Sequence, residues 1–210
     1  MSTALIVFAK APVAGAVKTR LIPALGAEGA AALAEWLLAH TLAAAVAAGF
    51  DHLELCVAPD TSHPAFGALA AAHGLALTVQ GEGDLGARMD RALTRVLRCH
   101  RHALLIGTDA PALDAARLRD AAQALHGADA VFVPALDGGY ALVGLQRAQP
   151  ALFQGIAWST AQVMAQTRTR ALAAGLAWAE CDPVADIDEP VDLIHLPAGW
   201  AAGWSAAWAT

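Results

Sequence analysis

Cysteine is scarce in this chain. The three cysteines (Cys56, Cys99 and Cys181) are far apart, and no two of them form a C-x-x-C pair. Neither a disulfide framework nor a zinc knuckle is therefore indicated. Reduced thiols in a cytoplasmic protein are the simplest interpretation.

Charged residues are also few. They make up 15% of the chain against 57% hydrophobic residues, a composition that excludes intrinsic disorder. The formal net charge of −6 excludes a general nucleic-acid binder, which usually shows a basic face. Three of the 13 lysines and arginines nevertheless lie between residues 10 and 20. A basic cluster in an acidic chain favours a small anionic ligand.

Long runs of large apolar residues are missing too. The apolar run at residues 4–9 is short for a signal peptide, no positive residue precedes it, and Lys10 ends it. Residues 30–50 are apolar, but they are rich in alanine and contain Glu35 and His40. We expect them to form a largely buried helix rather than a membrane span.

Several catalytic and ligand-binding motifs are absent. The P-loop spacing fails, because Val17, not a glycine, directly precedes Lys18 and no glycine stands six residues before it. The first loop has no G-x-G-x-x-G fingerprint, and the chain has no G-x-S-x-G elbow and no H-E-x-x-H pair. His100 and His102 flank the start of an expected strand, and we expect both at the surface, on the edge away from the site.

Apolar runs alternate with alanine-rich helical stretches along most of the chain. The expected strands are 4–9, 52–58, 75–79, 102–107, 128–135, 140–145 and 176–180. The expected helices are 27–48, 64–73, 85–101 with Asp84 as N-cap, 115–126 with Asp114 as N-cap, 159–174 and 189–196. This alternation predicts an α/β fold with a mainly parallel sheet and helices on both faces. We expect a single domain over residues 1–196.

Unusual loops follow four of the expected strands, and parallel sheets bind ligands at the carboxyl ends of their strands. In the first loop, Gly15 would let the backbone approach a ligand, and Lys10, Lys18 and Arg20 would neutralise phosphate oxygens. The alternative is an exposed loop whose charges only aid solubility.

Two acidic segments are candidates for a metal site. Asp109 follows an apolar strand, where a carboxylate can hold Mg²⁺ beside phosphates, although it could equally cap the next turn. The late segment 186–188 carries Asp186 and Asp188, and either could complete the metal site with Asp109. Asp188 could instead be a helix N-cap before Pro190.

Asp137, Gly138 and Gly139 follow the fifth expected strand. Asp-Gly between apolar runs is a hairpin signal, while the two glycines could leave room for a substrate. Residues 197–210 form a tryptophan-rich extension in which Trp200, Trp204 and Trp208 are four residues apart. We expect this stripe to pack on the domain or to form a contact between two copies in a homodimer.

Taken together, these loops resemble the bacterial DUF2064 family of selenodomain-associated, GT-A-like transferases in the nucleotide-diphospho-sugar transferase superfamily. The resemblance runs to about residue 196 and is carried by FAKAPVAGAVKTRL, GDLGARM, IGTDAPAL, PALDGGYALVGL, WST at 158–160 and DIDEPVDL.

The resemblance implies a GT-A fold, a Rossmann-like α/β/α sandwich with a bound Mg²⁺ or Mn²⁺. By this resemblance, the first loop holds nucleotide phosphates, Asp109 binds the metal with Asp188 or Asp186, and Asp84, Gly86 and Arg88 contact the base or ribose. Asp137, Gly138 and Gly139 would line the substrate pocket.

The leading hypothesis is a cytoplasmic, metal-dependent transferase that uses a nucleotide donor and a small-molecule acceptor. Nucleotidyl transfer from an NTP is favoured, with Lys18, Arg20 and Asp109 as the catalytic residues. The alternatives are a glycosyltransferase using an NDP-sugar and a non-catalytic module that senses a nucleotide. We expect no nucleic-acid partner.

Overall fold

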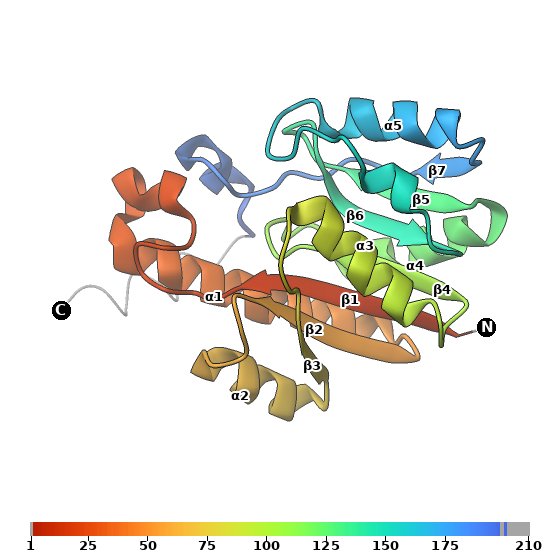
Figure 1. The fold of residues 1–210 in the computed structure, drawn as a ribbon. Helices are drawn as coiled ribbons and strands as arrows, with labels where there is room; N and C mark the ends of the chain where they lie inside the picture. The colour runs from red at the N-terminus through yellow and green to blue at the C-terminus, as the bar shows by residue number, and fades with distance from the viewer. Residues whose placement is uncertain (1, 198–199, 201–210) are drawn as a thin grey trace.

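The computed structural model describes residues 2–197 and residue 200. Its centre is one seven-stranded sheet with the order β3-β2-β1-β4-β6-β5-β7 (Figure 1). The strands are β1 Thr3–Lys10, β2 His52–Ala58, β3 Ala76–Val79, β4 His102–Ile106, β5 Ala130–Pro134, β6 Tyr140–Leu145 and β7 Trp178–Glu180. The expected α/β fold with a mainly parallel sheet is confirmed.

Strand directions place the ends of β1, β3, β4 and β5 on one edge of the sheet. β1 pairs in parallel with β2 and β4, and β2 pairs in parallel with β3. β6 runs antiparallel to both β4 and β5, so β5 has the direction of β4. The hairpin predicted from Asp137-Gly138 is thus confirmed, and the four unusual loops share one edge.

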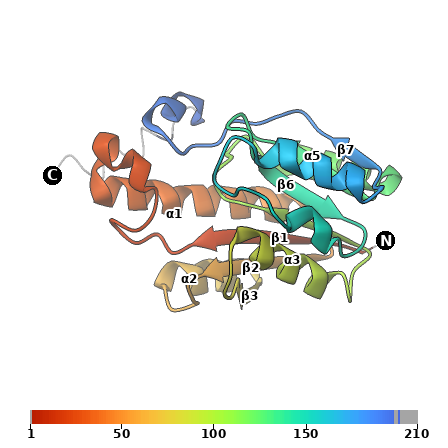
Figure 2. The same cartoon turned by 45° about the horizontal axis from the view of Figure 1, so that its top comes forward.

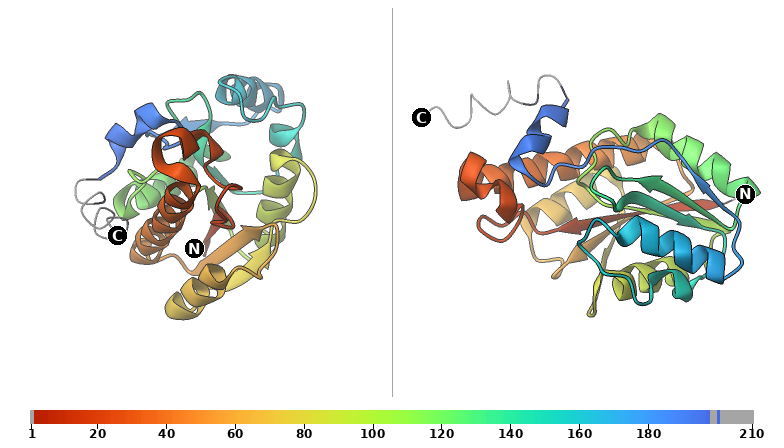
Figure 3. Two further views of the ribbon diagram at one scale, coloured as in Figure 1. Left: turned by 90° about the vertical axis from the view of Figure 1, so that its left-hand side faces the viewer. Right: turned by 90° about the horizontal axis from the view of Figure 1, so that it is seen from above.

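Helices cover both faces of the sheet (Figures 2 and 3). They are α1 Ile22–Ala48, α2 Pro64–His73, α3 Leu85–Val96, α4 Ala115–Ala124 and α5 Val163–Ala173. Four short 3-10 helices complete the elements: η1 Thr19–Leu21, η2 Leu125–Gly127, η3 Pro150–Phe153 and η4 Pro190–His195.

Side chains that alternate along the strands form one hydrophobic core on each face of the sheet. In β1, Leu5 and Val7 pack with the apolar residues of α1, α2 and α4, whereas Ala4 and Ile6 pack with those of α3, η3 and α5. Successive side chains of a strand point to opposite faces, so one buried strand serves both layers. Burying a leucine or isoleucine fully contributes about 1.5–3 kcal/mol, which makes β1 a major source of stability.

The apolar helix α1 is part of this core. It begins at Ile22, earlier than the predicted residue 27, and is kinked at Gly26, whose φ is 71°. Leu37, Leu38 and Leu42 on its inner face are at most 2% exposed. Among the described residues, Thr19–Ala48 is the one stretch long and apolar enough to cross a membrane, and 44% of its apolar window is buried within the fold.

Some element boundaries and one burial differ from the sequence-based expectations. The N-caps Asp84 and Asp114 are confirmed, since their carboxylates accept backbone N–H groups of the first helical turn. α3 ends at Val96 rather than residue 101, because the chain turns back toward β4. The prediction that His102 lies at the surface is wrong, because the residue is 2% exposed and its ring lies 5.0 Å from that of His126.

The expected helix start at Ser159 is also wrong. Ser159 has a φ of 62°, a left-handed conformation that no helix start uses, and α5 begins at Val163. In the C-terminal extension, Trp200 lies with its ring 5.9 Å from that of Trp36 on α1. Trp204 and Trp208 lie outside the described residues.

Candidate functional site

A cavity of about 650 Å³ opens at the shared edge of the sheet. The loops after β1, β4 and β5, together with segments 158–160 and 186–188, contribute to its walls. Among the residues that the sequence singled out, those lining it are Lys10, Lys18, Arg20, Asp109, Asp137, Gly139, Asp186 and Asp188. Residues from both ends of the chain therefore meet in one place.

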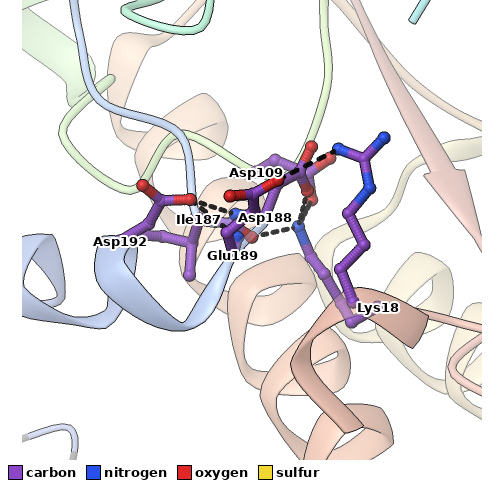
Figure 4. Close-up of polar contacts among 7 residues, drawn as sticks. Lys18, Asp109, Ile187, Asp188, Glu189 and Asp192 are labelled. Carbon is purple, nitrogen blue, oxygen red and sulfur yellow. Dashed lines mark hydrogen bonds and ion pairs between the residues drawn. The ribbon is translucent and has the colours of Figure 1, made fainter. Parts of the chain in front are cut away.

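Lys18 lies at the centre of this site, between two carboxylates (Figure 4). Its ammonium nitrogen is 2.5 Å from Oδ1 of Asp109 and 2.9 Å from Oδ1 of Asp188. It also donates a hydrogen bond of 2.6 Å to the carbonyl oxygen of Ile187. The backbone of Lys18 is left-handed, with a φ of 47°, which is uncommon for a residue with a Cβ. The left-handed backbone and the three polar contacts together fix the position of the Lys18 side chain.

Backbone contacts bring the late acidic segment to β4. The N–H of Ile187 donates a hydrogen bond of 2.8 Å to the carbonyl oxygen of Asp109. Asp192 then accepts from the N–H groups of Asp188 and Glu189, at 3.1 and 2.7 Å. The N-cap of η4 is Glu189, which forms a capping box with Asp192, so Asp188 is not the N-cap and its carboxylate faces Lys18 instead.

The surroundings of Lys18 keep its ammonium group positively charged. Burial of this side chain, which is 6% exposed, opposes its charge. The nearby carboxylates of Asp109 and Asp188 outweigh that effect and raise the pKa of Lys18 above its usual value. The two carboxylates are 46% and 40% exposed, so both can reach a ligand in the cavity.

This geometry fits a divalent metal. The ammonium group of Lys18 is itself a cation held by Asp109 and Asp188, so the two carboxylates already form a cation-binding pair. Within the described part of the chain, no three or more His, Cys, Asp or Glu side chains group as metal ligands. Mg²⁺ commonly takes one or two carboxylates and completes its shell with phosphate oxygens and water, which two carboxylates suit.

Lys10 and Arg20 also line the cavity, but fewer contacts hold their side chains than hold the side chain of Lys18. The ammonium group of Lys10 donates a hydrogen bond of 2.6 Å to the carbonyl oxygen of Ala16. The guanidinium of Arg20 is 3.9 Å from the carboxylate of Glu189, and both side chains are exposed. Gly15 has a φ of 78° and does not line the cavity. Its role in the loop is a turn, while the two cations remain able to contact an anion.

The turn that contains Asp137 closes the β5–β6 hairpin and also lines the cavity. Oδ1 of Asp137 accepts a hydrogen bond of 2.7 Å from the N–H of Gly139, which closes the turn between β5 and β6. Gly138 has a φ of 93°, and a Cβ there would lie 2.3 Å from the carbonyl oxygen of Ala161. Gly138 thus leaves room for the chain's own backbone, whereas Asp137 and Gly139 face the cavity.

Asp186 lies near this turn. Burial and, next, repulsion from Asp137 raise the pKa of its carboxyl group to about 6. Asp188 repels it less strongly than Asp137 does. The segment before Asp186 runs beside the β5–β6 turn, where Ala135 pairs with Val184, so Asp186 lies on the Asp137 side of the cavity. The carboxylate of Asp188 faces Lys18.

Asp84, Gly86 and Arg88 do not line the cavity. Asp84 caps α3 by accepting from the N–H of Ala87, and Arg88 donates to the carbonyl oxygen of Gly83. Gly86 lets α3 approach Trp158, because a Cβ there would lie 2.7 Å from its ring. These residues shape the loop after β3.

Three lining residues were missed by the sequence analysis. Gln80 is 7% exposed and donates to the carbonyl oxygens of Ala9 and Cys56. Tyr140 and Trp158 form an aromatic wall, with their ring centroids 6.4 Å apart in an edge-to-face arrangement. The motifs PALDGGY and WST, which contain Tyr140 and Trp158, were the available signals. A position in a strand does not by itself say which face of the sheet an aromatic ring covers.

Comparisons with known proteins place this chain in a family. A family model described as an uncharacterised protein conserved in bacteria (DUF2064) matches residues 41–160. The chain belongs to the DUF2064 family. No curated protein matches the sequence.

Solved structures share the DUF2064 chain's fold. A protein from Desulfovibrio desulfuricans G20, assigned provisionally as a nucleotide-diphospho-sugar transferase, superposes with a TM-score of 0.85 at 28% identity. The match covers 98% of this chain and 91% of that one. The fold is therefore that of the nucleotide-diphospho-sugar transferases.

More distant structures agree on the fold. Rv0371c from Mycobacterium tuberculosis H37Rv, solved in complex with manganese, matches with a TM-score of 0.59 and 22% identity over 93% of this chain and 98% of its own. CMP:2-keto-3-deoxy-manno-octonic acid synthetase, solved with CTP, matches with a TM-score of 0.61 and 10% identity over 97% of this chain and 100% of its own.

Proposed function

We propose that this chain is a metal-dependent transferase that uses a nucleotide donor, with nucleotidyl transfer from an NTP favoured. The observation that carries the proposal is the position of Lys18 between Asp109 and Asp188, in a cavity at the carboxyl edge of the sheet that the cations of Lys10 and Arg20 also line. Two carboxylates for a metal and nearby cations for phosphates are what a nucleoside triphosphate needs.

Each residue has a defined role in this proposal. Asp109 and Asp188 would hold Mg²⁺ or Mn²⁺, which would neutralise charge on the donor phosphates. Lys10, Lys18 and Arg20 would bind phosphate oxygens and stabilise the leaving group. The structure solved with manganese and the one solved with CTP support a metal and a nucleotide as ligands of this fold.

The chemical step needs no covalent bond to the protein. An oxygen of the acceptor forms a bond to the α-phosphorus of the NTP, and the bond from that phosphorus to the bridging oxygen breaks. Pyrophosphate leaves with the electron pair, and the proton of a hydroxyl acceptor passes to solvent water. The protein contributes position and charge.

Two alternatives remain in the same site. In a glycosyltransferase, the acceptor oxygen would attack the sugar carbon of an NDP-sugar and NDP would leave, an alternative favoured by the assignment of the Desulfovibrio protein. In a nucleotide-sensing module, the ligand would bind without turnover. Asp109→Asn would then leave ligand-dependent behaviour largely intact, whereas it would abolish catalysis in an enzyme.

The test is thermal stability against a panel of NTPs and NDP-sugars, with Mg²⁺, Mn²⁺ or EDTA. A ligand at 100 times its Kd stabilises the native state by about 2.7 kcal/mol. We expect a metal-dependent shift with one donor, lost in Asp109→Asn and kept in the exposed control Asp120→Asn. Release of pyrophosphate rather than NDP then identifies nucleotidyl transfer. The proposal fails if no nucleotide shifts the melting temperature with any metal.

The remaining expectations are part of the same proposal. Residues 1–196 would form the functional domain, with residues 197–210 as an extension. The partners would be a nucleotide donor and a small-molecule acceptor, and the location would be the cytoplasm.

A further inference from the structure

The cavity has two halves of opposite charge. In the sheet order, β1 lies on one side of β4, and β6 and β5 lie on the other. The lysines and arginine that line the cavity are Lys10, the last residue of β1, and Lys18 and Arg20 in the segment that follows it. Asp137, in the β5–β6 turn, and Asp186 also line the cavity. The segment before Asp186 runs beside this turn, since Ala135 pairs with Val184, so both aspartates lie in the opposite half. Asp109, at the end of β4, lies between the two halves.

The acidic half has no compensating cation in the part of the chain that the structure describes. No described lysine, arginine or histidine forms an ion pair with Asp137 or Asp186. One oxygen of Asp137 accepts from the N–H of Gly139, which leaves acceptor capacity on this carboxylate. Two carboxylates without a cation partner repel a further negative charge and accept hydrogen bonds from hydroxyl or amino groups.

The same half carries an aromatic wall. Tyr140 and Trp158 line it, and the hydroxyl-bearing residues Ser159 and Thr160 follow directly. Ser159 is held with a positive φ of 62°, and a strained non-glycine residue of this kind is common where a ligand is bound. Ring faces contact apolar C–H surface, while carboxylates and hydroxyls bind polar groups. A polyhydroxylated molecule presents both kinds of surface.

The basic half and the acidic half therefore suit different substrates. The phosphates of the proposed donor belong over β1 and the central Asp109–Asp188 pair, where the cations are. The acceptor is left with the half that contains Asp137, Asp186, Tyr140 and Trp158. An acceptor bearing a phosphate or carboxylate would meet two carboxylates there and no described cation.

We propose that the acceptor is a polyhydroxylated molecule without negative charge, such as a sugar or an amino sugar, bound between Asp137, Asp186 and the Tyr140–Trp158 wall. This inference rests on the proposed function and adds the substrate class of the same site. The chemical step is unchanged: an acceptor hydroxyl oxygen forms the new bond, the leaving group takes the electron pair, and the hydroxyl proton passes to water.

The experiment supplies acceptors sorted by charge. A bacterial small-molecule extract is separated by ion exchange into anionic, neutral and cationic fractions. Each fraction is incubated with the protein, Mg²⁺ or Mn²⁺, and the donor that gives the largest melting shift, radiolabelled in the transferred group. We expect labelled product from the neutral or the cationic fraction, and the two fractions distinguish a sugar from an amino sugar. Product from the anionic fraction, or from none while the donor still shifts the melt, overturns the inference.

Two conservative variants test the residues themselves. Asp137→Asn keeps an oxygen for the N–H of Gly139, and Asp186→Asn keeps the size of its side chain. We expect each to raise the KM for the active fraction at least tenfold while the donor-induced melting shift is unchanged. Asp120→Asn, an exposed aspartate on α4, is the matched control. An unchanged KM in both variants overturns the inference, whereas loss of the donor shift in the wild-type chain would count against the proposed function instead.

Discussion

The ammonium nitrogen of Lys18 lies 2.5 Å from Oδ1 of Asp109, in the position between two carboxylates that a metal ion would take. A lysine that binds donor phosphates and a lysine that neutralises the metal ligands cannot use the same hydrogen bonds. Under the proposed function, Lys18 would therefore exchange partners when metal and donor bind. This exchange would couple the two ligands, because each would remove a competitor for the other.

Lys18→Met should separate metal binding from nucleotide binding. Without the ammonium group, Asp109 and Asp188 face each other with no cation between them, so Mn²⁺ alone should bind ~10-fold more tightly, or about 1.4 kcal/mol. Isothermal titration with Mn²⁺ in the absence of nucleotide measures this. Arg20→Met is the control, because its exposed side chain touches neither carboxylate of the pair. Equal or weaker Mn²⁺ binding by Lys18→Met would contradict the exchange.

Gly138→Ala should destabilise the fold. A Cβ at Gly138 would lie 2.3 Å from the carbonyl oxygen of Ala161, and its φ of 93° is unfavourable for alanine. The cost should be about 3 kcal/mol or more in urea unfolding, because backbone must move. Gly67→Ala is the matched control, since Gly67 lies within α2 with open space around it and no positive φ. That substitution should stabilise by about 0.5–1 kcal/mol. Equal effects would mean that the Ala161 contact is not rigid.

Arg95→Met should be among the most destabilising changes far from the site. Glu54 is 1% exposed, and Arg95 binds both of its carboxylate oxygens. Burial opposes the charge of Glu54, but these hydrogen bonds outweigh it and lower its pKa. Removing the arginine leaves a buried charge, which typically costs about 3–5 kcal/mol.

The exposed pair Arg168–Glu180 provides the control for this prediction. Its side chains are 46% and 28% exposed. Arg168→Met should therefore cost less than about 1 kcal/mol in the same unfolding assay. A similar loss in the two variants would show that Glu54 is not buried as the structure has it.

His102 should make stability fall on mild acidification. Burial first, and then the neighbouring charges of His126 and Arg101, lower the pKa of His102 below its usual 6.5. The unfolded chain therefore takes up a proton at a higher pH than the folded chain. The stability present above pH 6.5 is lost as the pH falls below it.

Asp186 acts in the opposite direction and must be considered with His102. Its pKa is raised to about 6, so its contribution to stability is present at acid pH and is lost as the pH rises through 6. Asp186 is present in both His102→Gln and the wild type, so its contribution cancels when their pH profiles are subtracted. Between pH 7.5 and 5.5, we expect His102→Gln to lose less unfolding free energy than the wild type. The exposed control His195→Gln should lose as much as the wild type. Parallel pH profiles would refute the assignment to His102.

The fold was largely predictable because its signals are local. Strand-helix alternation predicted the strands in β1 to β7 to within two residues at each end, and Asp84 and Asp114 marked helix starts by a side chain capping its own turn. Helix ends were less predictable. α3 ends at Val96 and α5 begins at Val163 because of tertiary contacts that local propensity does not contain.

Within the candidate site, the sequence identified residue types but not their partners. Lys10, Lys18, Arg20, Asp109 and Asp188 were all found from their positions after strands, and all line the cavity. Asp84, Gly86 and Arg88 were also singled out, yet the approach of α3 to Trp158 keeps them out of the cavity wall.

Local patterns in the amino-acid sequence were enough to predict the α/β class, the edge of the sheet where the candidate site lies and the basic character of the loop after β1. These follow from patterns a few residues long, through apolar alternation, capping and the fixed direction of parallel strands. Only the tertiary structure brings Lys18 to Asp188, which is 170 residues away, and places the segment of Asp186 beside the turn that holds Asp137. Such contacts depend on how the sheet orders its strands and how backbone hydrogen bonds bring the late segment to β4, and no local pattern contains that information.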